Sequence, residues 1–241
     1  MRKIYNVMFG IYVVISLYIG RLKFEILKKN MTEEEVESYA FNYVKTWARK
    51  ILKGTGCTIN VVGTENLTEG NCLFVHNHQE YFDILIMIGY IDKPKGFIAK
   101  KELEKVPAVS YWMKQIHCIF MDREDSRESV KSILEGVELL KSGYSMSIAP
   151  EGTRSKGPNM GEFKKGSMKL ATKAGVPVVP VALNNVYRLT DGKGFLHIKP
   201  TKMDIIISKP IETKTMTREE QNNLSEMVKA EIQKSLDAIN K

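Results

Sequence analysis

From Gly54 onward, the sequence alternates short apolar runs with stretches whose apolar residues recur at helical spacing. Apolar runs of roughly four to eight residues are typical of buried strands, and their alternation with helices is typical of βαβ units. Such units build a sheet whose two faces are covered by helices. Strands are predicted over residues 58–62, 72–75, 96–99, 118–121, 145–149, 176–183 and 202–207. The predicted fold class is therefore α/β, with a mostly buried mixed sheet flanked by helices.

Two of the predicted helices carry clear end signals. Ser126 can cap the first of them, and Gly143 can end it. The last helix begins with the capping-box pattern formed by Thr217 and Glu220. Their expected inward faces are Val130, Ile133, Leu134, Val137 and Leu140 for the first helix, and Leu224, Met227, Val228 and Leu236 for the last.

The N-terminal segment has a different composition from the rest. Residues 4–19 carry no charge, whereas a full membrane span needs ~20 apolar residues. Residues 33–52 follow with an amphipathic stripe, which packing on the domain would also explain. We expect the two helices to form a hairpin in one leaflet; a single span and a buried helix are the alternatives. The predicted organisation is thus a membrane-associated two-helix motif over residues 1–53 and an α/β domain over residues 54–241.

The formal net charge of +8 indicates an anionic partner, such as nucleic acid, membrane phosphates or a phosphorylated metabolite. Nucleic acid is disfavoured because aromatic-rich strand motifs are missing and the N-terminus is apolar. The three cysteines are scattered and form no C-x-x-C pair, which is typical of free thiols in a reducing compartment.

The segment NHQEYFD, residues 77–83, places a histidine and an aspartate between two apolar runs. His78 lies just past a predicted strand, at the carboxyl edge where ligands collect in such sheets. Asp83 falls in the first turn of the following helix, where an ionised carboxylate is favoured. Asp83 can orient the imidazole, so that its other nitrogen takes a proton from a hydroxyl. A polar turn with a hydrogen-bonded imidazole is the alternative.

A metal site is the other chemistry that this segment suggests. His76 and His78 form a His-Asn-His pattern, and His78-Gln79-Glu80 resembles half of a zinc deaminase signature. The P-C-x-x-C half is missing, and the remaining histidines are distant in the chain. We therefore expect no metal.

A second polar cluster, APEGTRSKG, follows the predicted strand at residues 145–149. Gly152 allows close approach of the backbone to a ligand, and Arg154 offers a planar fork for phosphate oxygens. Glu151 and Thr153 complete the predicted substrate-binding segment. A solvated basic loop is the alternative.

Two further cations also follow predicted strands: Lys100 and Arg123. Because the carboxyl ends of parallel strands meet at one edge, these two residues, His78 and Arg154 are expected to line one basic pocket. The pattern predicts a single base among phosphate-binding side chains.

The order of these segments resembles the four motifs of the glycerolipid acyltransferases. They are His78 with Asp83, IFMDR at residues 119–123, PEGTRS with FKKG, and VPVVPVAL at residues 176–183. The resemblance implies that His78 is the general base and Asp83 its partner. It also assigns Lys100 to the family's A-K-K-E-L stretch, and Arg123 and Arg154 to the acceptor's phosphate. Glu80 departs from the serine that is usual in the first motif, and Ala149 from phenylalanine.

The resemblance further implies acyl transfer to the sn-2 hydroxyl of 1-acyl-glycerol-3-phosphate, giving phosphatidic acid. The donor would be acyl-CoA or acyl carrier protein, and no further cofactor is expected. Expected partners are these substrates and the phospholipid surface at the cytoplasmic face of the cell membrane, and residues 54–241 would be the acyltransferase domain. A different lysolipid acceptor, glycerol-3-phosphate as acceptor and a non-catalytic lipid-binding relative remain alternatives.

Overall fold

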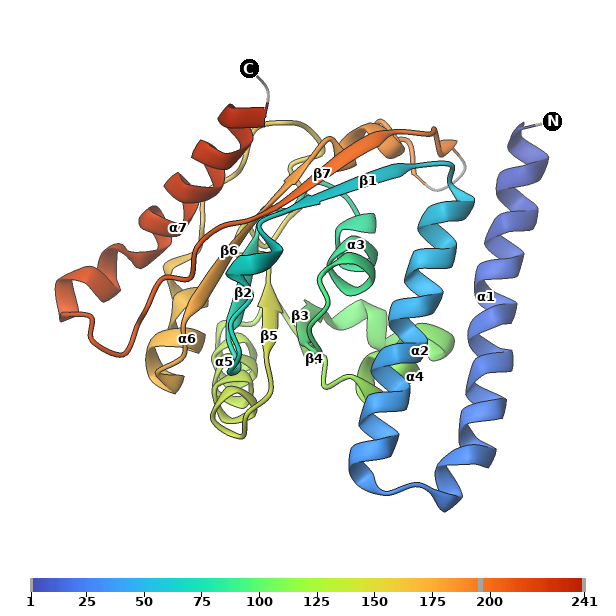
Figure 1. Ribbon diagram of the computed structural model, residues 1–241, viewed down its shortest axis with the longest axis horizontal. Coiled ribbons are helices and arrows are strands. Elements are labelled where there is room, and N and C mark those ends of the chain that lie inside the picture. Colours follow the sequence, from blue (N-terminus) through green and yellow to red (C-terminus); the bar gives the residue numbers. More distant parts are fainter. Residues whose placement is uncertain (1, 195–196, 240–241) are drawn as a thin grey trace.

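The computed structural model describes residues 2–194 and 197–239, and it contains a seven-stranded mixed sheet between two layers of helices (Figure 1). The strand order is β1-β7-β6-β2-β5-β3-β4. All neighbouring strands run parallel except β6 and β7. The fold class and the predicted strands are confirmed. The strands are β1 (Thr58–Val62), β2 (Leu73–His76), β3 (Gly96–Lys100), β4 (Ile119–Met121), β5 (Met146–Ile148), β6 (Val178–Asn184) and β7 (Lys202–Ile207).

One face of the sheet is covered by α5 (Ser126–Lys141), α6 (Lys169–Ala174) and α7 (Arg218–Ile239) (Figure 1). The capping box of α7 is confirmed, because Thr217 and Glu220 exchange hydrogen bonds. The cap predicted for α5 is wrong by one residue. The Asp125 carboxylate, a stronger acceptor than a serine hydroxyl, accepts the first backbone N–H groups of the helix instead.

The inward faces of these two helices are narrower than predicted. On α5, Val137 and Leu140 are buried, whereas Val130 and Leu134 are exposed. On α7, Leu224, Val228 and Leu236 are buried, but Met227 is exposed. The buried residues recur at the helical period, and the exposed apolar residues Val130, Leu134 and Met227 lie at the edges of that buried stripe.

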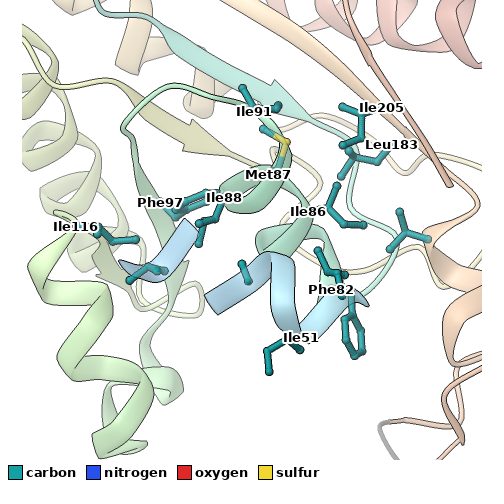
Figure 2. Packing of buried hydrophobic residues seen from close by; sticks show 14 of the residues in the cluster. Ile51, Phe82, Ile86, Met87, Ile88, Ile91, Phe97, Ile116, Leu183 and Ile205 are labelled. Atoms are coloured by element: carbon teal, nitrogen blue, oxygen red, sulfur yellow. The ribbon is translucent and has the colours of Figure 1, made fainter. Parts of the chain in front are cut away.

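The opposite face is covered by α3 (Phe82–Tyr90), α4 (Pro107–Gln115) and α2 (Glu33–Gly54), with α1 (Arg2–Leu27) outermost (Figure 1). Side chains from the sheet, α3 and α2 interlock in one apolar core (Figure 2). Its fully buried members include Ile51, Ile86, Met87, Ile91 and Ile205. The amphipathic stripe of α2 is therefore core packing, which is the alternative raised from the sequence.

Short 3₁₀ segments connect several of these elements: η1 (Lys28–Asn30), η2 (Thr64–Asn66), η3 (Lys101–Lys105), η4 (Lys165–Met168) and η5 (Val186–Leu189). The turn between α1 and α2 ends in a capping box, in which the Thr32 side chain accepts from the Glu35 backbone and the Glu35 side chain accepts from the Thr32 backbone. This cap fixes the point at which the chain reverses.

Polar contacts fix α1 on the rest of the molecule. The Trp47 indole donates to the Ser16 hydroxyl over 2.8 Å, and the Tyr43 hydroxyl donates to the Ser16 carbonyl over 2.8 Å. A Cβ atom at Gly20 would lie 1.8 Å from the Tyr43 hydroxyl oxygen, so only glycine allows this approach.

The outward side of α1 is apolar and uncovered. Its inward residues Phe9, Leu17 and Phe24 are buried, but a long row of outward residues is exposed. The helical stretch Ile4–Asn30 is long and apolar enough to cross a membrane by length and composition, and 22% of its most apolar window is buried. The exposed row consists of Ile4, Val7, Met8, Ile11, Tyr12, Val14, Ile15, Tyr18, Ile19, Leu22 and Ile26. Tyr5 is also exposed, but its hydroxyl donates to the Gly54 carbonyl at the end of α2 over 2.8 Å.

Candidate active site

The loops that follow β2, β3, β4 and β5 converge at one edge of the sheet. These strands run parallel, so their carboxyl ends share that edge. His78 lies two residues beyond β2, and the 149–155 segment follows β5. The Ser155 backbone N–H donates to the His78 carbonyl over 2.8 Å, which joins the two loops.

His78 and Asp83 form a close pair. The distance between His78 Nδ1 and Asp83 Oδ2 is 2.7 Å, and the carboxylate is fully buried. The same oxygen accepts the backbone N–H groups of Gln79 and Glu80 over 2.7 and 3.0 Å. With Nδ1–H donating to Asp83, Nε2 carries the free lone pair. The His78 side chain is 13% exposed, so the imidazole is not sealed in the interior as the Asp83 carboxylate is.

Neighbouring buried amides hold the loop that carries His78. The Asn77 amide exchanges two hydrogen bonds with the backbone of Leu183, at the end of β6. The Gln79 side-chain oxygen accepts the Val186 backbone N–H over 2.8 Å. Neither amide carries a local sequence signal for this contact, although both lie within the first motif. These bonds fix the loop against β6, which sets the position of the imidazole.

Glu151, which the sequence predicted to bind substrate, contacts backbone groups of the protein. Its Oε1 accepts the His78 backbone N–H over 2.6 Å, and its Oε2 accepts the Gly161 backbone N–H over 2.7 Å. Burial raises the pKa of this carboxyl, and the two backbone N–H groups act in the opposite direction. Both oxygens are thus engaged within the protein, where they hold the loop after β2 to the segment around residue 161. The substrate contact of Glu151 stays a prediction.

Arg154 lies beside Glu80 and Tyr81. Its Nη1 donates to Glu80 Oε1 over 2.9 Å, and its guanidinium lies over the Tyr81 ring, 3.6 Å from the centroid. The Thr190 hydroxyl donates to the other oxygen of Glu80 over 2.9 Å. Thr190 was not predicted as a site residue. It follows β6 and is distant in the sequence from the first motif, so no sequence pattern connects the two.

Arg123 is tied to Gly152, since its Nη1 donates to the Gly152 carbonyl. Gly152 has a φ of +73°, a conformation that favours glycine and that turns its carbonyl toward this arginine. Burial lowers the pKa of Arg123. The loops that follow β4 and β5 are therefore in direct contact through Arg123 and Gly152.

Lys100 and Thr153 are both at the protein surface. Lys100 pairs with Glu102 over 2.8 Å, and this hydrogen bond raises the pKa of the lysine. Arg123 acts electrostatically on the same lysine, so both cations lie at this end of the sheet. Thr153 is exposed.

A cavity of about 230 Å³ opens beside the Pro150–Gly152 segment. Its apolar wall combines side chains from the ends of three strands with side chains from α5. Cationic side chains lie around it. The apolar residues are Ile98, Met121, Val130, Ile133, Leu134 and Ile148, and the cations are Arg123, Lys164, Lys169 and Lys173. The cavity can take an apolar chain that carries an anionic group at one end.

His76 is buried behind the pair, and its Nδ1 lies 2.8 Å from the Asn77 carbonyl. Burial lowers its pKa to about 4. Groups of three or more side chains able to hold a metal ion do not occur among the described residues. His76 is accordingly a neutral residue of the interior at pH 7.

We expect His76 to make the protein sensitive to acid. Its folded-state pKa of about 4 lies below the ordinary value of 6.5, so the unfolded chain binds more protons between these values. The stabilising effect is complete above pH 6.5 and is lost as the pH falls toward 4; at pH 5 about 2 kcal/mol is gone. Urea unfolding at pH 7.5 and 5.0 measures this, with His76→Gln showing a smaller difference. An equal loss in both proteins would contradict the assignment.

Comparisons with known proteins place this site in a family. The family model described as Acyltransferase matches residues 58–184. The chain belongs to the acyltransferase family. The matched region contains His78, Asp83, the 149–155 segment and the strands β1 to β6. The resemblance expected from the motifs is thereby confirmed.

Individual relatives agree with this placement. The 1-acyl-sn-glycerol-3-phosphate acyltransferase of Borreliella burgdorferi is 30% identical over 76% of this chain and 74% of its own length. The chloroplast 1-acyl-sn-glycerol-3-phosphate acyltransferase of Brassica napus is 35% identical, but this chain spans only 44% of its length. The crystal structure of the 1-acyl-sn-glycerophosphate acyltransferase PlsC from Thermotoga maritima superposes with a TM-score of 0.85 at 27% identity. That match covers 100% of this chain and 98% of the other.

Proposed function

We propose that this protein transfers a fatty acyl group to the sn-2 hydroxyl of 1-acyl-glycerol-3-phosphate, giving phosphatidic acid. The donor is an acyl thioester of coenzyme A or acyl carrier protein. The observation that carries the proposal is the His78–Asp83 pair at the carboxyl edge of the sheet, 2.7 Å apart and beside Arg154 on the neighbouring loop. The acceptor is supported by the names of the relatives in Borreliella burgdorferi and Thermotoga maritima.

In the proposed reaction, His78 Nε2 removes the proton from the acceptor hydroxyl as its oxygen attacks the thioester carbonyl. The tetrahedral intermediate then expels the thiolate, which takes the proton from the imidazolium. Asp83 holds the ring and stabilises its protonated form. General-base help contributes ~10²–10⁴-fold, and holding both substrates in place supplies much of the rest. The sequence and the described contacts point to no nucleophile, so the transfer is direct.

The acyl chain of the donor fits the cavity beside the Pro150–Gly152 segment. Its wall is apolar, as a fatty chain requires, and Lys164, Lys169 and Lys173 can face anionic groups of the donor. Glu151 belongs to the segment beside this cavity and accepts the His78 backbone N–H, so a direct hydrogen bond connects that segment to the loop that carries the base.

Release of free thiol tests the proposed activity. Purified protein is mixed with an acyl-CoA or acyl carrier protein and with a panel of acceptors, namely lysophosphatidate, other lysophospholipids and glycerol-3-phosphate. We expect thiol release to depend on lysophosphatidate and phosphatidic acid to form in equal amount. A preference for another acceptor would replace this substrate, and the absence of thiol release with every acceptor would refute the enzyme activity.

Arg154 is expected to bind the acceptor's phosphate. Arg154→Ala should raise KM for lysophosphatidate by roughly one to two powers of ten, because a hydrogen bond to a charged group contributes ~1.5–3 kcal/mol. Arg154→Lys should recover only part of the loss, since lysine keeps the charge but not the two-pronged geometry. Steady-state kinetics with each substrate varied measures both effects. A defect confined to the thioester would place Arg154 at the donor instead.

We further propose that the outward side of α1 lies in one leaflet of the membrane. Its exposed apolar row would be buried there, while Phe9, Leu17 and Phe24 stay in the core. Lys28 and Lys29 lie in the turn at the end of α1, where basic side chains contribute roughly 1 kcal/mol each on an anionic surface. An acceptor that is itself a membrane lipid then reaches the site without leaving the bilayer.

Polar substitutions on this outward side test the attachment without opening the core. Ile11, Ile15 and Leu22 are 47%, 51% and 67% exposed. Replacing all three with Gln should lower vesicle binding by roughly tenfold per residue, because each loses apolar contact with lipid. Co-sedimentation with anionic vesicles measures binding, and Met227→Gln on α7 is the matched control. A triple variant that still sediments fully would refute the attachment.

A further inference from the structure

Glu80 is the feature of the site that the proposed reaction leaves unused. It stands between the base and its partner in sequence, and only 1% of the residue is exposed. Its Oε1 accepts from Arg154 Nη1 over 2.9 Å and from the Tyr81 backbone N–H over 3.0 Å. Its Oε2 accepts from the Thr190 hydroxyl over 2.9 Å. One buried carboxylate thus joins the start of α3, the loop after β5 and the turn after η5.

The position of this carboxylate does not depend on Arg154. The Tyr81 N–H and the Thr190 hydroxyl hold one oxygen each, and both Glu80 and Thr190 are only 1% exposed. Arg154, by contrast, sits on an irregular loop, with 23% of its side chain exposed. The fixed partner of the ion pair is therefore Glu80, and the arginine is the group that is held.

The guanidinium keeps donors for a ligand after these contacts are made. It has five N–H donors. Nη1 reaches Glu80, and Nη2 donates to the Tyr81 hydroxyl over 2.9 Å. Tyr81, whose ring lies beneath it, is 63% exposed, so the stacked pair lies at the protein surface where a ligand can approach it. An arginine held in this way presents a planar fork whose orientation is set before the ligand arrives.

We propose that Glu80, supported by Thr190, is a positioning residue that fixes the Arg154 guanidinium for the acceptor's phosphate. The inference rests on the proposed function of Arg154 and deepens it. Without the carboxylate, a long side chain on a loop must be ordered when substrate binds, and binding is weakened by that cost. Glu80 acts through Arg154 and does not touch the reacting atoms.

Charge repulsion would have the opposite effect on the affinity for the acceptor. A carboxylate near a phosphate site also repels the phosphate, so removing it would strengthen acceptor binding if repulsion dominated. Glu80→Gln removes the charge but keeps an oxygen for Arg154. Glu80→Ala removes both. Comparing the two variants separates the contact from the charge.

The experiment measures kcat and KM for lysophosphatidate and for the acyl donor in a set of variants. Glu80→Ala should raise KM for lysophosphatidate roughly three- to tenfold, with kcat and the donor's KM within twofold of the wild-type values. Glu80→Gln should restore KM to within twofold, and Thr190→Val should raise it about twofold. Glu80→Ala combined with Arg154→Ala should have the same KM as Arg154→Ala alone. Glu65→Ala, on the connection between β1 and β2, is the matched control.

Three results would overturn the inference. They are a KM at or below the wild-type value in Glu80→Ala, full additivity with Arg154→Ala, and a fall in kcat that Glu80→Gln does not rescue. Failure of the proposed phosphate site looks different. In that case Arg154→Ala itself leaves KM for lysophosphatidate unchanged, whatever Glu80 does.

Discussion

His78→Ala should reduce turnover by roughly 10²–10⁴-fold while the fold and acceptor binding remain intact. The imidazole acts on the proton of the acceptor hydroxyl and makes no contact with its phosphate in the proposed reaction, so kcat falls and KM changes little. Thiol release gives the rate, circular dichroism the fold, and calorimetric titration the affinity for lysophosphatidate.

The control for this variant is His197→Ala. His197 is exposed and its Nδ1 lies beside the Lys193 carbonyl, without a contact to His78 or Asp83, so its removal should leave the rate unchanged. If His78→Ala kept more than about a tenth of the wild-type rate, the loss would fall short of general-base catalysis and the assignment would be wrong.

Asp83→Asn should lower turnover by roughly 10²–10⁴-fold, comparable to the loss of the base itself. The amide has nearly the same size, and its oxygen can still accept the Gln79 and Glu80 N–H groups. What disappears is the negative charge that stabilises the protonated imidazole and fixes its tautomer. Thiol release again measures the rate, and the urea midpoint reports whether the buried substitution has changed stability.

The matched control is Asp92→Asn, since Asp92 pairs with Lys45 and its side chain is 68% exposed. An Asp83→Asn variant that folds normally and retains the wild-type rate would show that the aspartate only shapes the loop. Equal loss of rate and of stability would point to misfolding. Asp83→Glu then distinguishes the two roles, because it restores the charge in an enlarged side chain.

The sequence alone predicted the site wherever neighbouring residues decide it. His78 and Asp83 face each other because a strand end, a short loop and the first turn of a helix lie within eight consecutive positions, 76–83. The strands were predictable for a related reason. β6 is buried at every position, and such strands read as continuous apolar runs in any context.

Contacts between segments that are distant in the sequence could not be predicted from neighbouring residues. Thr190 is 110 positions from Glu80, and Glu151 is 73 positions from the backbone N–H that it holds. Their residue types are equally compatible with a surface loop or a substrate contact. Whether a carboxylate binds a ligand or the protein depends on which backbone groups the fold brings to it, and the sheet order decides that.

In the N-terminal helices α1 and α2, too, the sequence determined one property and the tertiary structure another. Their helical period and apolar character come from the sequence, because side-chain spacing alone sets which residues share a face. Spacing does not determine whether an apolar face packs against the protein core or against lipid, since both environments accept apolar side chains. Only the packing of α2 against α3 and α4 settled that its stripe is core, and left the outward row of α1 uncovered.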